Sequence, residues 1–157
     1  MVRVLIADDY SPTREMLRLF LSEDPGLVVV GEAENGLQAV ELARDLSPDC
    51  VLMDVAMPVM NGIAATKLIR KADDRVRVIT LSGHSEPGVS RAALAAGAYR
   101  HLTKPFDLFT LVALLKVIDE GPAPEPGRAT AEPGSTRAPR PALQPGFLLD
   151  GSGQGRS

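Results

Sequence analysis

The sequence is short of cysteine: Cys50 is the single thiol among 157 residues. One thiol cannot form an internal disulfide, so nothing in the chain requires an oxidising compartment. Its neighbours Val51 and Leu52 are apolar, which predicts a small buried thiol rather than a redox centre. Disulfide-stabilised and thiol-redox proteins are therefore disfavoured classes.

Long apolar runs and a large excess of one charge are also absent. No stretch approaches the roughly 18–20 apolar residues of a membrane span. The first apolar run ends in two aspartates, unlike a secretory signal. The formal net charge of −3 gives no broad attraction to nucleic acid or anionic membranes. We therefore expect a cytoplasmic protein that does not bind a membrane.

The composition changes abruptly near residue 120. Residues 121–157 contain 7 prolines and 7 glycines, too few apolar groups to offset the entropy of ordering the segment. We predict a folded domain over residues 1–120 and a disordered tail over residues 121–157. An apolar triplet at residues 147–149 interrupts the tail, as a chance cluster or as a short docking motif for a partner.

Strand and helix patterns alternate along residues 1–120. The predicted strands cover residues 2–7, 27–30, 50–53, 76–81 and 99–102. The predicted helices cover residues 11–23, 36–46, 62–71, 87–96 and 106–119. Ser11 and Asn35 are the expected N-caps of the first two helices, and Met16, Leu17, Phe20 and Leu21 are expected on one helix face. This alternation predicts a parallel α/β sheet with helices on both faces and a site beyond the carboxyl ends of the strands.

Acidic side chains follow two of the predicted strands. Asp8 and Asp9 end the first strand, and Asp54 ends the third. If these strands are neighbours, the three carboxylates converge, and their repulsion favours a bound cation. Magnesium is the natural candidate because it prefers carboxylate oxygens and often bridges to phosphate.

Two further polar residues follow the fourth and fifth strands, Ser82 and Lys104. Together with the acidic cluster they suit phosphoryl transfer onto Asp54, whose carboxylate needs no general base at neutral pH. The metal would neutralise the transferring oxygens, and Lys104 and Ser82 would each bind one. Each residue alone is compatible with an ordinary turn or cap, but their conjunction at strand ends favours the site.

With these residues in place, the sequence resembles the receiver domains of two-component response regulators over residues 1–119. The resemblance is carried by six segments of sequence: LIADD (5–9), VGEAENG (30–36), LMDVAMPVMNG (52–62), ITLSGH (79–84), AGA (96–98) and LTKP (102–105). It implies a flavodoxin-like, doubly wound sheet of five strands in the order 2-1-3-4-5, with five helices.

The resemblance also implies the role of each site residue. Asp54 would be the phosphoacceptor, and Asp9 and Asp54 would bind Mg2+ together with the backbone carbonyl of Ala56. Asp8 would support the metal through water, while Ser82 and Lys104 would bind the phosphoryl group. The Lys104–Pro105 bond is a candidate cis peptide.

Switching in this family pairs the residue matching Ser82 with an aromatic residue on the fifth strand. His101 stands at that position, where Tyr or Phe is commoner, so it is either a switch residue or an ordinary half-buried strand residue. Ala56 and His84 would flank the phosphate and affect how long it survives, in a direction the sequence leaves open.

Nothing after residue 119 resembles a helix-turn-helix or an enzymatic module. We therefore predict a signalling switch rather than an enzyme, catalysing only its own phosphorylation and dephosphorylation. Its donor would be a sensor histidine kinase, and its output a protein contact over residues 87–119, where Ala92, Ala93 and Ala96 leave a low-relief helix face. Alternatives are a phosphorelay intermediate that passes phosphate to a histidine phosphotransfer protein, and an unphosphorylated scaffold. Phosphorylation-dependent homodimerisation stays open.

Overall fold

The computed structural model describes residues 1–83 and 86–119. Its strands are β1 (Val2–Ala7), β2 (Leu27–Ala33), β3 (Cys50–Asp54), β4 (Arg77–Ser82) and β5 (Arg100–Thr103). Its helices are α1 (Ser11–Ser22), α2 (Gly36–Leu46), α3 (Gly62–Ala72), α4 (Pro87–Ala95) and α5 (Leu108–Asp119). The predicted tail, its triplet at residues 147–149 and His84 lie outside the described residues.

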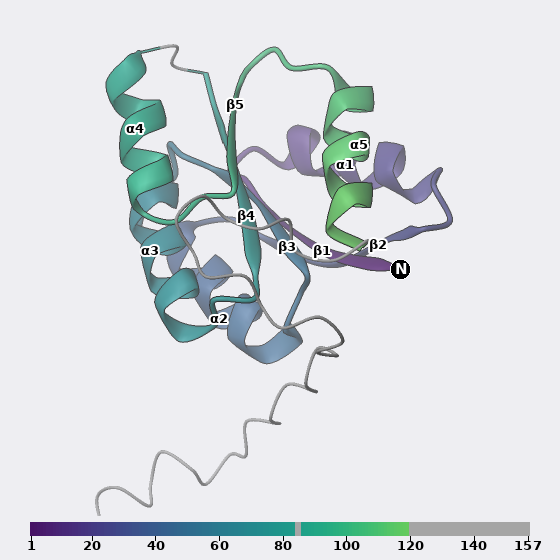
Figure 1. The fold of residues 1–157 in the computed structure, drawn as a ribbon, viewed down its shortest axis with the longest axis horizontal. Coiled ribbons are helices and arrows are strands. Elements are labelled where there is room, and N and C mark those ends of the chain that lie inside the picture. Colours follow the sequence, from purple (N-terminus) through teal and green to yellow (C-terminus); the bar gives the residue numbers. More distant parts are fainter. Residues whose placement is uncertain (84–85, 120–157) are drawn as a thin grey trace, which may run out of the picture. The chain divides into compact units, whose positions relative to one another are not determined.

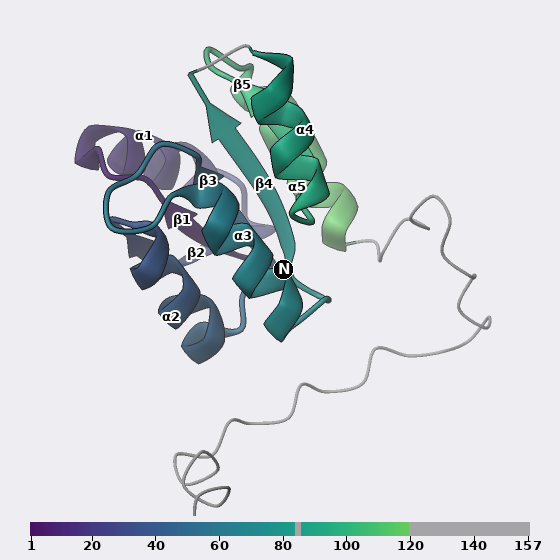
Figure 2. The same ribbon diagram turned by 90° about the vertical axis from the view of Figure 1, so that its left-hand side faces the viewer.

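All five strands are parallel and follow the order β2-β1-β3-β4-β5, which confirms the predicted topology. Helices α1 and α5 lie on one side of the sheet, and α2, α3 and α4 lie on the other (Figure 1). Figure 2 views the sheet from the side of α2, α3 and α4. This arrangement leaves the carboxyl ends of the strands for the loops that carry polar residues.

The core has two apolar layers, one on each face of the sheet. On one face, Ile6 and Leu52 belong to a cluster with Leu17 of α1 and Leu111 of α5. On the other face, the buried side chains that α2 and α3 contribute are mostly alanines. Strand β3 is buried at every position, and Cys50 has no exposed surface, as the unbroken apolar pattern predicts.

Helix α2 begins as predicted, but α1 and α5 do not. The Asn35 side chain accepts a hydrogen bond from the Gln38 N–H at 2.8 Å. Ser11 was expected to cap α1, yet Tyr10 is the N-cap, because its carbonyl already accepts the N–H groups of Thr13 and Arg14. Helix α5 begins at Leu108 rather than residue 106.

The start of α5 follows from Asp107, a capping signal that the sequence interpretation overlooked. The Asp107 carboxylate accepts hydrogen bonds from the Phe109 N–H at 3.0 Å and from the Thr110 hydroxyl at 3.2 Å. A side chain that satisfies free N–H groups at a helix end fixes where the helix begins. The Lys104–Pro105 peptide bond just before it is cis, as the family resemblance implies.

Two predicted faces also need correction. In α1, Leu17 and Leu21 are buried, but Met16 is 44% exposed and does not share their buried face. In α4, Ala93 is fully buried whereas Ala92 is exposed, so the two do not share one low-relief surface. Strand β2 is longer than predicted, because Gly31 and its successors continue to pair with β1.

Candidate functional site

Three carboxylates meet at the carboxyl edge of the sheet. Strands β1 and β3 are hydrogen-bonded neighbours, with Ala7 opposite Met53, so the residues that follow them emerge side by side. One oxygen from each of Asp8, Asp9 and Asp54 lies within 4.8 Å of the others. Asp8 and Asp54 are buried, and Asp9 is exposed. The predicted convergence is therefore confirmed.

Lys104 brings an ammonium group to the same edge. Its Nζ atom lies 3.1 Å from Oδ1 of Asp54 and 3.3 Å from Oδ2 of Asp8. The Lys104 N–H donates to the carbonyl of Ser82 at 2.7 Å, which ties the residue to the end of β4. Lys104 thus bridges the two buried carboxylates.

The electrostatics of the cluster leave negative charge uncompensated. Burial, and then the negative charge of Asp8, raise the pKa of Asp54 above its ordinary value, and the hydrogen bond from Lys104 offsets this only in part. Burial lowers the pKa of Lys104, but its contacts with Asp54 and Asp8 outweigh that effect and raise the pKa overall. Both shifts show that the site favours additional positive charge.

The donor set fits a hard divalent cation. Three carboxylates face a single ammonium, and all the charged acceptors are oxygens, the ligand type that Mg2+ prefers. A cation there would offset the repulsion between Asp8 and Asp54 that Lys104 leaves in place. Ala56 lies two residues beyond Asp54 in the exposed loop before α3, and the role of its carbonyl as a ligand stays a prediction.

The loop after β3 is anchored to the sheet by backbone hydrogen bonds. The Val55 N–H donates to the carbonyl of Leu81 at 2.9 Å, and the Gly62 N–H donates to the carbonyl of Val55 at 2.8 Å. A Cβ atom on Gly62 would stand 2.0 Å from the carbonyl oxygen of Asp54, so only glycine allows this approach. At the loop's tip, Val59 adopts a positive φ of 68°.

Ser82 and His101 occupy neighbouring strands. Ser82 is 1% exposed at the end of β4, and His101 pairs with Thr80 two residues earlier on that strand. The Nδ1 atom of His101 lies 2.8 Å from the Thr80 hydroxyl oxygen. Its Nε2 atom is buried and has no hydrogen-bond partner among residues 1–83 and 86–119. Burial lowers the pKa of His101.

The sequence interpretation missed Thr80 as a partner of His101. Strand alternation could have indicated this contact, because residues two apart on one strand share a face. Thr80 lies two residues before Ser82 and therefore shares its face. The sequence interpretation also missed Arg14, whose guanidinium group contacts the backbone of Asp8. No local pattern in the sequence identifies that contact.

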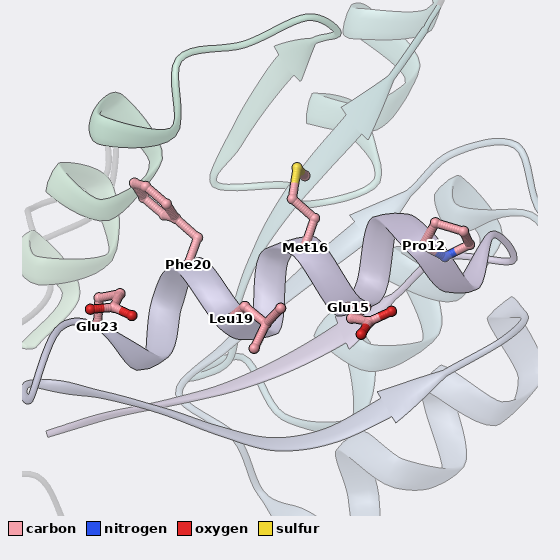
Figure 3. Close-up of a pocket in the computed structure, with 6 residues that line it drawn as sticks. All are labelled: Pro12, Glu15, Met16, Leu19, Phe20 and Glu23. Carbon is pink, nitrogen blue, oxygen red and sulfur yellow. The ribbon is translucent and has the colours of Figure 1, made fainter.

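A shallow apolar hollow lies along α1, which begins directly after the acidic turn. Its lining residues are Pro12, Glu15, Met16, Leu19, Phe20 and Glu23 (Figure 3). Leu19 is 54% exposed. The Phe20 ring points toward α5 and packs edge-on against Phe109, with the two ring centroids 5.6 Å apart. In the described part of the chain, no helix has both the length and the apolar character to cross a membrane.

The parallel sheet in the order β2-β1-β3-β4-β5 and the carboxylate cluster at its edge are the features that the family resemblance predicted. The model of the response regulator receiver domain family matches residues 4–116. The chain belongs to this family, and its receiver domain is a switch of two-component signalling.

Named relatives agree with this assignment. The chemotaxis protein CheY of Thermotoga maritima is 40% identical over 118 residues, which cover 75% of this chain and 98% of CheY. The crystal structure of the response regulator domain of T. maritima CheB is 41% identical, with a TM-score of 0.66 over 76% of this chain and 95% of that domain.

Other relatives are longer than this chain. The transcriptional regulatory protein LnrK of Bacillus subtilis is 36% identical over 132 residues, which cover 84% of this chain but 60% of LnrK. DegU of Brevibacillus brevis is 37% identical, over 78% of this chain and 52% of DegU. The chain thus spans between half and two thirds of these regulators.

Proposed function

We propose that the protein accepts a phosphoryl group from a sensor histidine kinase on Asp54 and then presents an altered surface to a protein partner. The observation that carries this proposal is the Lys104 ammonium group, 3.1 Å from a buried Asp54 carboxylate within a cluster of three acids. In the proposed site, Asp9, Asp54 and the carbonyl of Ala56 hold Mg2+, and Asp8 supports it through water.

The reaction proposed for Asp54 is a direct displacement at phosphorus. A carboxylate oxygen forms a new bond to phosphorus as the bond to the kinase's histidine nitrogen breaks, and that nitrogen keeps the electron pair. Lys104 then shifts its hydrogen bond from the Asp54 carboxylate to a phosphoryl oxygen, and the Ser82 hydroxyl donates to another. A bound divalent cation would supply neutralisation of the remaining phosphoryl charge.

The proposed output passes through Ser82 and His101. Movement of the Ser82 hydroxyl toward the phosphoryl group would empty space beside His101, which is held on the adjacent strand by Thr80. Exposed apolar side chains lie on the elements next to this pair, with Leu94 on α4 at 48% and Phe109 on α5 at 75% exposure. The proposed partner would contact one of these exposed side chains.

Mass spectrometry of the purified chain after incubation with acetyl phosphate tests the phosphoacceptor directly. We expect a gain of one phosphoryl group that requires Mg2+ and disappears in Asp54→Ala. Asp45→Ala is the matched control, because Asp45 is an exposed aspartate on α2. Retention of the modification in Asp54→Ala would contradict the proposal, as would a wild-type chain that neither acetyl phosphate nor a histidine kinase modifies.

A further inference from the structure

We propose that Arg14 is a positioning residue for the divalent cation, because it fixes the turn that presents Asp8 and Asp9. The inference rests on the function proposed above, since it concerns the same site. Arg14 lies in the first turns of α1, and its side chain is only 12% exposed. A cation buried to this degree is retained where it has specific partners.

The partners of Arg14 come from two different strands. Its Nη1 atom donates to the backbone carbonyl of Asp8 at 2.6 Å, at the end of β1. Its Nε atom donates to Oε1 of Glu32 at 3.3 Å, near the end of β2. Its Nη2 atom lies 3.8 Å from the exposed Glu34 carboxylate. The planar guanidinium fork therefore joins the Asp8 turn to the neighbouring strand.

The carbonyl of Asp8 is the contact that bears on the site. The Asp8 N–H donates to the carbonyl of Ala33 at 3.0 Å, and the Asp8 carboxylate accepts the Tyr10 N–H at 2.9 Å. With Arg14 on its carbonyl, Asp8 is held at its amide, its side chain and its carbonyl. That carbonyl shares a planar peptide unit with the Asp9 nitrogen, so holding it also orients Asp9.

Asp9 depends most on this support because it is the exposed member of the carboxylate cluster. A metal ligand that is oriented before binding loses less entropy when the cation arrives. The delocalised Arg14 charge also lies close to the cluster, so on charge alone its removal would favour a bound cation. A weaker Mg2+ affinity without Arg14 therefore reports the geometry of the Asp8–Asp9 turn.

Arg18 supplies a matched control on the same helix. Its Nε atom lies 3.3 Å from Oε2 of Glu32, the carboxylate that Arg14 also binds, but its side chain is 45% exposed. Among residues 1–83 and 86–119, Arg18 forms its ion pair with Glu32 and none with Asp8, so Arg18→Ala removes a Glu32 ion pair and leaves the turn untouched. Exposed ion pairs of this kind contribute little to stability.

The test is a Mg2+ titration of the full chain. Binding is monitored by the changes in NMR chemical shift of the Asp9 and Asp54 amides. We expect Arg14→Ala to weaken Mg2+ binding about tenfold, the size typical of lost support around a metal ligand. Arg18→Ala should change it by less than about twofold. Arg14→Lys keeps one donor for the Asp8 carbonyl and should recover part of the loss.

The spectra also separate the possible failures. Unchanged Mg2+ affinity in Arg14→Ala, or an equal loss in Arg18→Ala, would overturn the positioning role while leaving the proposed function in place. A wild-type chain that binds no Mg2+ would instead remove the proposed function, and this inference with it. If Arg14→Ala does not fold, Arg14→Lys decides: an affinity equal to that of the wild type overturns the proposal, and a partial loss supports it.

Discussion

At the scale of single residues, the pair formed by Thr80 and His101 distinguishes this site. The histidine ring uses Nδ1 to contact the Thr80 hydroxyl and leaves Nε2 buried without a partner among the described residues. Protonation would place a charged N–H at Nε2, where no acceptor is present to compensate its lost hydration. The neutral ring is therefore the form that the fold favours.

This pair makes folding stability depend on pH below neutrality. Burial lowers the pKa of folded His101 below the ordinary value of 6.5, so the unfolded chain binds more protons as the pH falls through that value. We expect the contribution of His101 to stability to be complete above about pH 6.5 and to decline below it. Urea unfolding at pH 8.0, 6.5 and 5.5 measures this decline.

His101→Phe is the control, because a phenyl ring keeps the apolar contacts and cannot titrate. The variant should lose less stability than the wild type between pH 6.5 and 5.5. Equal losses would mean that the carboxylates alone cause the decline and that His101 stays neutral in both states.

The residues of the candidate site could largely be predicted because they follow strands. Asp8 and Asp54 come directly after apolar residues and Lys104 follows the short strand β5, and parallel strands bring such positions to one edge. Arg14 could not be predicted, because its contact with Asp8 depends on how α1 lies over the sheet. Val59 was also unforeseeable, since a β-branched residue disfavours the positive φ it adopts.

At the scale of secondary-structure elements, the start of α3 determines how closely that helix approaches β3. Gly62 opens α3 with Asn61 as N-cap, whose side chain accepts the Ala64 N–H at 2.9 Å. The helix end lies against the Asp54 carbonyl, where no side chain can fit. The position of the Asp54 backbone is therefore coupled to α3.

Gly62→Ala tests this coupling. The added Cβ atom would stand 2.0 Å from the Asp54 carbonyl oxygen and 2.9 Å from the Met53 side chain. We expect a loss of about 2–3 kcal/mol in the free energy of unfolding, the upper range for overpacking a fitted contact. Urea denaturation measures the loss.

Gly88→Ala is the matched control, a helical glycine on α4 where an added Cβ would meet no atom of another element within 4 Å in the described part of the chain. It should be neutral or stabilise the protein by up to about 1 kcal/mol, because alanine restricts the unfolded chain more than glycine does. Equal stabilities for the two variants would show that α3 can move away from β3 without cost.

Element types and order were predictable from periodicity, but the ends of some elements were not. The Asn35 cap was evident because Asn followed by Gly after a strand is a local signal. Helix α1 has Tyr10 as its N-cap with no capping hydrogen bond from the side chain, which no local pattern marks, and α5 begins where the Asp107 carboxylate accepts the Phe109 N–H. Strand β2 is longer than its apolar run because pairing with β1 extends it through Gly31 and Glu32.

At the scale of the whole molecule, the faces of the sheet carry the apolar core and its carboxyl edge carries the candidate site. The buried strand residues fill the two apolar layers, while the residues just past the strand ends form the cluster of Asp8, Asp9, Asp54 and Lys104. Sequence reasoning recovers this division well, because it depends on hydrophobic patterning and strand direction alone. The proposed protein partner depends instead on exposed side chains of α4 and α5, where sequence patterns carry less information.

The burial of Cys50 in the central strand makes its thiol a reporter of how fast β3 opens to solvent. Cys50 is the single thiol of the chain, and it has no exposed surface. Burial raises the pKa of this thiol, so very little of the reactive thiolate forms in the folded protein. A thiol-alkylating reagent should therefore label the native protein only as fast as β3 opens to solvent.

Because Asp54 lies on the same strand, a ligand of the acidic edge should slow that labelling in proportion to its occupancy. Alkylation kinetics with and without Mg2+, read by intact mass, would thus report cation binding through a sulfur atom that never touches the ion. Labelling as fast as that of the urea-unfolded chain would show that β3 opens freely.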